Sequence, residues 1–176
     1  MILRFFRSTK SDDALYAVYS AIVAQSRLPV FYEAWGVPDT VTGRFDMISL
    51  HTAMVFRRLR SPDTRTRDFA QGLFDVFFKD MDRALREMGV GDLSVGKKIE
   101  KMGSLFYGTL TALNDALDAP DPMPGLRAVI ARNFHDGEQR PHLDAFATYI
   151  VACDRELATQ DVEAIKAGTI AFREAK

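Results

Sequence analysis

The sequence predicts an all-α protein: a single-domain bundle of seven or eight helices with no sheet. Three observations favour this class. Apolar residues recur every three to four positions in successive segments. Clusters of Gly, Pro, Asp and Ser separate those segments, as is typical of connections between helices. No stretch shows the strict apolar–polar alternation of a half-buried strand.

The composition is that of an ordinary globular chain, with 176 residues, 47% hydrophobic and 27% charged. We expect one domain over 1–176, with a basic, apolar N-terminal extension at 1–10, a core region at about 11–118 and C-terminal helices at about 124–173. The net charge of -1 gives no general affinity for DNA. A single cysteine, Cys153, favours a reducing compartment, and no apolar run approaches the roughly 20 residues of a membrane span. These features predict a cytoplasmic protein.

The first helix is expected to begin at Ser11, a good N-cap residue. Asp12 and Asp13 follow in its first turn, where the helix dipole favours negative charge. A short aromatic turn over 29–35 comes next, and Gly36 ends it in the usual position after a helix.

A second long helix is predicted from about Arg44 to Arg60. Apolar residues cover most of its circumference, so we expect neighbouring helices to bury it at the centre of the bundle. Its apolar residues are Phe45, Met47, Ile48, Leu50, Met54, Val55 and Leu59. His51 lies among them and is interpreted as a core histidine with satisfied hydrogen bonds.

Two further amphipathic helices flank a glycine-rich corner. The first ends at Met88 and the second runs to about Leu117. The remaining predicted helices are 126–134, 141–157 and a last one, capped by Thr159, that reaches Phe172.

The corner, GVGDLSVGKK at 89–98, is one residue short of the phosphate-loop motif G-x-x-x-x-G-K-[ST] of nucleotide-binding proteins. Lys98 replaces the hydroxyl that would bind Mg²⁺, and the segment before the loop has helical rather than strand periodicity. Nucleotide binding is therefore disfavoured. Gly89 and Gly91 instead permit positive φ at a tight turn, and Asp92 or Ser94 is expected to cap the next helix.

A metal-dependent phosphohydrolase of the all-helical HD class is one alternative function. His135 and Asp136 form the HD pair, and His51 and Asp144 could complete the set. The pair lies in a predicted loop, and the E-x-x-H motif of di-metal bundles does not occur. We expect no metal, no cofactor and no catalytic residue, and interpret His135 and His142 as exposed loop residues.

Arginines gather where the central predicted helix ends. Arg57, Arg58 and Arg60 complement the negative end of the helix dipole, and Arg65 and Arg67 border the following loop. One interpretation is that these arginines are solvated side chains at the end of the helix. The functional interpretation is a docking patch for phosphate, anionic lipid or an acidic protein surface.

Two runs resemble the ubiquinol–cytochrome c chaperone family, and more closely its alphaproteobacterial members. They are GVPDTVTGRFDMISLHTAMVFRRLR at 36–60 and LFDVFFKDMDRALREMGVGDLSVGKKIEKM at 73–102. LYAVYSAIVAQSRLPVFYEAWG, at 15–36, extends the resemblance to most of residues 11–115.

The resemblance implies a non-enzymatic assembly factor, a chaperone for cytochrome b in biogenesis of the quinol–cytochrome c oxidoreductase (cytochrome bc) complex. Mitochondrial relatives bind newly made cytochrome b and are associated with the translating ribosome near the inner membrane. A peripheral membrane contact or a ribosome contact follows from this resemblance as an expectation.

A protein that holds a nascent membrane protein needs an exposed apolar groove beside basic surface. The candidate partner-binding residues are Phe31, Tyr32, Trp35, Arg57, Arg58, Arg60, Lys97 and Lys98. A generic helical adaptor that binds RNA or protein is the other alternative function, and RNA binding would require a face of one charge sign.

Overall fold

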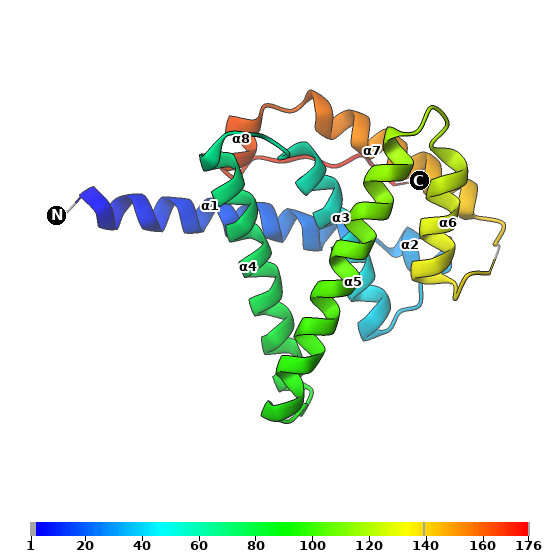
Figure 1. Ribbon diagram of the computed structural model, residues 1–176, viewed down its shortest axis with the longest axis horizontal. Helices are drawn as coiled ribbons and strands as arrows, with labels where there is room; N and C mark the ends of the chain where they lie inside the picture. Colours follow the sequence, from blue (N-terminus) through cyan, green and yellow to red (C-terminus); the bar gives the residue numbers. More distant parts are fainter. Residues whose placement is uncertain (1–2, 139, 176) are drawn as a thin grey trace.

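The structure, a computed structural model, describes the backbone of residues 3–138 and 140–175 and, within these limits, the side chains from Asp12 onward. This part of the chain contains eight helices and no strand, which confirms the all-α class. The helices are α1 (Leu3–Ser26), α2 (Pro29–Glu33), α3 (Val41–Arg58), α4 (Thr64–Glu87), α5 (Asp92–Asp118), α6 (Met123–Phe134), α7 (Leu143–Thr159) and α8 (Val162–Lys166). Figure 1 shows α4 and α5 as a long hairpin whose turn projects away from the other helices.

Helix α3 forms the centre of the bundle, as its sequence predicts. It packs against α1, α5, α6 and α7, and every residue from Met47 to Val55 is buried. Its first turn is fixed by Thr40, whose side chain accepts a hydrogen bond from the Gly43 N–H at 3.2 Å.

The start of α1 differs from the prediction. The helix begins at Leu3, so Ser11 lies inside it and is not the N-cap. No Gly or Pro interrupts the chain between Leu3 and Ser11, and polar residues alone do not stop an exposed helix. The side chains of the predicted extension at 1–10 lie outside the described residues.

The corner between α4 and α5 matches the predicted turn only in part. Gly89 has a φ of +80°, a conformation that favours glycine. Gly91 has a φ of −63° and is itself the N-cap of α5. The predicted caps, Asp92 and Ser94, are therefore wrong: Asp92 is the first helical residue, and its carboxylate pairs with Arg86 instead.

The last helix is shorter than predicted. It ends at Lys166 rather than near Phe172, and Asp161, not Thr159, caps it by accepting a hydrogen bond from the Glu163 N–H at 3.2 Å. The prediction followed the apolar spacing, which continues after the helix has ended.

Contacts with other parts of the fold prevent α8 from continuing beyond Lys166. Gly168 has a φ of +95° and lies so close to α1 that an added Cβ would be 3.2 Å from the Cβ of Ala17. Beyond it, the Gln160 side chain donates to the Ala171 carbonyl at 2.8 Å and accepts from the Ala171 N–H at 2.9 Å. The Phe172 ring then packs edge-on against His51, so the tail closes over the core as an extended segment.

His51 is fully buried and links three helices. Its Nδ1 lies 2.9 Å from the Met47 carbonyl, which can only accept, so Nδ1 carries the ring proton. Nε2 then accepts a hydrogen bond from the Tyr149 hydroxyl at 2.8 Å, and that oxygen accepts from the Gln25 amide at 2.8 Å. Side chains of α1, α3 and α7 thus form one hydrogen-bonded chain, which confirms that His51 is a satisfied core histidine.

Arg57 connects the end of α3 to two neighbouring helices. Its guanidinium donates to Asp154 of α7 at 2.9 Å, and to Asn114 and Asp118 of α5 at 3.1 and 2.6 Å. The side chain is only 17% exposed. These contacts place Arg57 among the residues that hold the helices together.

We predict that Arg57→Met lowers the free energy of unfolding by about 1–3 kcal/mol, because it leaves the partly buried Asp154 carboxylate and the Asn114 amide without their donors. Arg60→Met, at an exposed position, should change it by less than about 0.5 kcal/mol. Urea unfolding of both variants checks the difference, and equal effects would contradict the structural role of Arg57.

We predict that His51 makes stability depend on pH. Burial lowers the pKa of His51 to about 4, whereas the unfolded chain protonates at about 6.5. The stability contributed by the neutral ring is therefore complete above pH 6.5 and falls by roughly 1.4 kcal/mol per pH unit towards the folded pKa. Urea unfolding should show a loss between pH 7 and pH 5 that is about 2 kcal/mol larger for the wild type than for His51→Gln. Parallel pH profiles would exclude this effect.

Candidate functional site

The aromatic residues predicted to form an exposed groove lie mainly in the core. Phe31 and Trp35 are 0% and 5% exposed, and their rings pack 5.9 and 5.2 Å from the ring of Phe146. Tyr32 is partly buried, and its hydroxyl donates to the Ser26 carbonyl at 2.8 Å. The expectation of an exposed aromatic groove at this position is therefore wrong, because Phe31 and Trp35 pack against Phe146 of α7.

The arginines at the end of α3 are largely engaged with the protein itself. Arg57 makes the contacts described above, and Arg58 donates twice to the Gln160 carbonyl, at 3.1 and 2.5 Å. Arg60 is exposed at the rim of the shallow pocket that the three arginines form with Asp154. The guanidinium groups of Arg57 and Arg58 are therefore less available to a partner than the sequence indicates.

Lys97 and Lys98 are exposed at the opposite end of α5. Asp118, which pairs with Arg57, lies near the other end of this helix, about 30 Å away at roughly 1.5 Å per residue. The structure thus separates the eight candidate residues into a core cluster, a helix-end arginine cluster and a lysine cluster.

The residues of the HD alternative lie in different surroundings. His51 is in the core, and Asp144 pairs with Arg127 at the surface. In 3–138 and 140–175, no three His, Cys, Asp or Glu side chains are grouped as the ligands of a metal ion would be. His51, His135, Asp136 and Asp144 are therefore not grouped as the ligands of one metal ion within this part of the chain.

His135 and His142 form a pair and are not the exposed loop residues that the sequence suggested. Their Nε2 atoms lie 3.1 Å apart, and His135 is 7% exposed. Gly36 covers them with a φ of +70°, and a Cβ there would lie 2.9 Å from the His142 ring. Burial lowers the pKa of both rings. The pair lies between the α6–α7 connection and Gly36, in the turn that follows α2.

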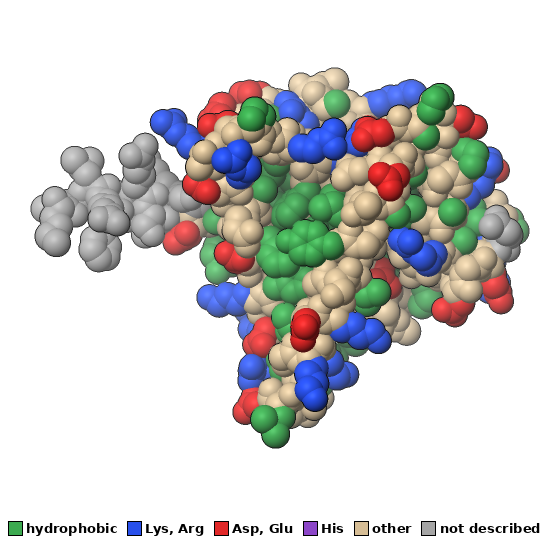
Figure 2. Space-filling view, in the orientation of Figure 1, with side chains coloured by type: hydrophobic (Ala, Val, Ile, Leu, Met, Phe, Trp, Pro, Cys, Tyr) green, Lys and Arg blue, Asp and Glu red, His purple; other side chains and the backbone are tan. Residues whose placement is uncertain are grey.

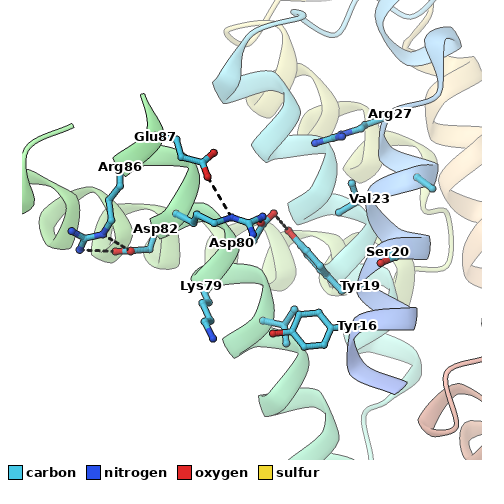
Figure 3. A pocket seen from close by; sticks show the side chains of 13 residues that line it. Tyr16, Tyr19, Ser20, Val23, Arg27, Lys79, Asp80, Asp82, Arg86 and Glu87 are labelled. Atoms are coloured by element: carbon cyan, nitrogen blue, oxygen red, sulfur yellow. Dashed lines mark hydrogen bonds and ion pairs between the residues drawn. The ribbon is translucent and has the colours of Figure 1, made fainter. Parts of the chain in front are cut away.

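A groove of about 900 Å³ lies between α1 and α4 (Figure 3). Across it, the Tyr19 hydroxyl donates to Asp80 at 2.8 Å. Burial, and then the Asp80 carboxylate, raise the pKa of Tyr19. Asp80 also pairs with Arg83 at 2.5 Å, and Asp82 with Arg86 at 2.6 Å. Charges of both signs neutralise one another along the groove, so it is not the single-signed face that RNA binding would require.

Partly exposed aromatic rings lie where α3, α4 and α5 meet. Phe74 lies 5.6 Å from Tyr107 and, like Phe56, packs on the buried ring of Phe106. Tyr107 is 51% exposed, and Phe56 and Phe74 are partly exposed. Figure 2 shows the resulting apolar area between α4 and α5. We call Phe56, Phe74 and Tyr107 the α4–α5 aromatic surface.

Sequence reasoning missed this surface. Each ring lies beside the apolar stripe of its own helix, and the sequence pattern assigns none of the three to the core or to a binding surface. The available signal was a surplus of aromatic residues in FDVFF (74–78) and FY (106–107), which is more than one helix face can bury.

The described residues contain no helix that is both long enough and apolar enough to cross a membrane.

Comparisons with known proteins agree on one family. The model of the ubiquinol-cytochrome C chaperone family matches residues 33–172. The crystal structure of the Cbp3 homolog from Brucella abortus has the same fold, with a TM-score of 0.89 and 36% identity over 99% of this chain and 98% of that one. Ubiquinol-cytochrome-c reductase complex assembly factor 1 from Xenopus laevis is 20% identical over 128 residues, which are 73% of this chain but 63% of the relative. The chain belongs to the ubiquinol–cytochrome c chaperone family.

Proposed function

We propose that this protein is a non-enzymatic assembly factor of the quinol–cytochrome c oxidoreductase and that it holds cytochrome b as its client. Membership of the chaperone family supports the assembly role. The name of the Xenopus laevis relative, an assembly factor of the ubiquinol–cytochrome c reductase complex, supports the same process. The proposal places the protein on the cytoplasmic side of the inner membrane, where it meets its client.

The observation that carries the proposal is the α4–α5 aromatic surface. Cytochrome b is an integral membrane protein, so a newly made chain presents apolar segments that require cover. An aromatic side chain buries 150–250 Å² when fully covered. Covering the exposed parts of Phe74 and Tyr107 would contribute about 2–4 kcal/mol at roughly 25 cal/mol per Å².

The arrangement of the rings suits a reversible contact. Phe74 and Tyr107 are held in place by Phe106, which is fully buried, so binding costs little side-chain entropy. A surface of this size gives a modest affinity, which a chaperone needs because it must release its client to the assembling complex.

Deletion of the gene should abolish or strongly reduce the assembled cytochrome bc complex and leave other respiratory complexes intact. Difference spectra of membranes would show loss of the b-type and c-type haem signals of this complex. Restoration by the wild-type gene is the control. Normal levels of the complex in the deletion strain would contradict the assembly role.

Tyr107→Asp should reduce recovery of cytochrome b with the purified protein by at least about fivefold, because a carboxylate on the aromatic surface is costly to cover. Tyr16→Asp is the matched control, since Tyr16 is 50% exposed but lies in the α1–α4 groove. Neither side chain is buried, so both variants should keep the circular dichroism and unfolding midpoint of the wild type.

Co-purification of epitope-tagged cytochrome b with each variant measures this effect. If Tyr16→Asp lost the client and Tyr107→Asp kept it, the groove rather than the aromatic surface would be the client site. If both variants kept it, the α4–α5 aromatic surface would have no part in client binding.

A further inference from the structure

The projecting turn of the α4–α5 hairpin carries apolar side chains on its outside. Leu93 is 94% exposed and Met88 is 49% exposed, while Val90 between them is partly exposed. Figure 1 shows that this turn projects beyond the neighbouring helices, and Figure 2 shows apolar atoms at its outermost point. A single exposed leucine is unremarkable, but two large apolar side chains at a projecting tip form a small apolar wedge.

Three lysines follow on α5 directly behind this wedge. Lys97, Lys98 and Lys101 are all exposed, and within the described chain their ammonium groups make no ion pair or hydrogen bond. Residues four and eight positions apart share one side of a helix, so Lys97 and Lys101 lie on the same side as Leu93.

The carboxylates near the tip share two arginines, Arg83 and Arg86. Asp92 pairs with Arg86, and Glu87 lies 3.8 Å from the Arg83 guanidinium. The same two arginines also pair with Asp82 and Asp80, and Glu100 is a further acidic side chain of this region. Over residues 82–101, five cationic side chains therefore stand against four carboxylates, so the tip carries a net charge of +1 although the whole chain has a net charge of -1.

We propose that the α4–α5 tip binds the surface of an anionic phospholipid bilayer, with Leu93 and Met88 inserted between the lipids and Lys97, Lys98 and Lys101 at the phosphates. Apolar side chains of interfacial helices reach about 5–10 Å into the boundary between headgroups and acyl chains. At about 1.5 Å per residue, Lys97 and Lys101 lie roughly 6 and 12 Å behind Leu93 along α5. When the tip enters end-on, these lysines are level with the headgroups.

An anionic bilayer fits the tip better than nucleic acid or an apolar protein groove, because the tip combines positive charge with exposed apolar side chains. Nucleic acid would use the lysines but would leave Leu93 in water, and an apolar protein groove would use Leu93 but not the lysines. An anionic bilayer provides a negative surface and an apolar interior within about 10 Å of each other. The inference goes beyond the proposed function, because it requires neither cytochrome b nor any other client.

Sedimentation with vesicles tests the proposal independently of the client. The full chain should bind vesicles of phosphatidylglycerol and phosphatidylcholine in equal parts, and not vesicles of phosphatidylcholine alone. Each Lys→Gln substitution at 97, 98 or 101 should weaken binding about fivefold, and Leu93→Gln roughly tenfold. High salt should weaken the binding of the wild type.

Two matched controls distinguish the tip from other surfaces. Val41→Gln alters an apolar residue that is 56% exposed at the start of α3, and Lys79→Gln alters an exposed lysine on α4. Both should bind the vesicles as the wild type does. Absence of wild-type binding, or equal loss in controls and tip variants, would overturn the proposal.

Leu93→Trp reports insertion directly. The only natural tryptophan, Trp35, is buried, so it contributes a constant background emission. Addition of anionic vesicles should shift the emission of the variant to shorter wavelength, and brominated lipids should quench it. Binding without a shift or quenching would mean that the lysines only touch the surface, and the insertion of Leu93 would be wrong.

Discussion

The burial of α3 from Met47 to Val55 is the constraint on which the rest of this structure depends. A helix that is covered on all sides cannot leave its polar side chains to water, so its neighbours must supply their partners. Tyr149 and Gln25 do this for His51, which fixes α7 and α1 against α3. At the end of the helix, Arg57 joins α3 to α5 and α7 through side-chain carboxylates and an amide. The bundle is thus held by apolar packing around α3 and oriented by these few polar contacts.

The α4–α5 hairpin has the opposite character. Its helices are 24 and 27 residues long, longer than the core they cover, so the hairpin extends past the other helices (Figure 1). Apolar side chains near its turn have no neighbouring helix to cover them, and the rings of Phe74 and Tyr107 are covered on one side only. Both proposed contacts use this hairpin: the lipid contact uses its projecting turn, and the client contact uses the uncovered space between its two helices. One element would then bring the protein to the membrane and present an apolar surface beside it.

The fold class and the central helix could be predicted from the sequence because they depend on local patterns. Apolar residues around most of the circumference of α3 predicted its burial. The same pattern predicted that His51 would be a core residue. The predicted helix ends were less accurate. Ser11 was expected to cap α1 and Thr159 to cap α8, because both are favourable N-cap types. The structure places Ser11 inside α1 and Thr159 at the end of α7, since a capping preference is worth only about 1 kcal/mol and does not by itself stop a helix.

The sequence by itself determined the all-helical class, the order of the long helices and the glycine turn before α5. Each of these follows from residues that are close together in the chain, through periodicity and backbone conformation. Only the tertiary structure decided which side chains are available to a partner. Phe31 and Trp35 are buried because α7 packs over them, whereas Phe74 and Tyr107 stay partly exposed because no helix covers the space between α4 and α5. Exposure depends on contacts between distant segments, and no local pattern of residues specifies those contacts.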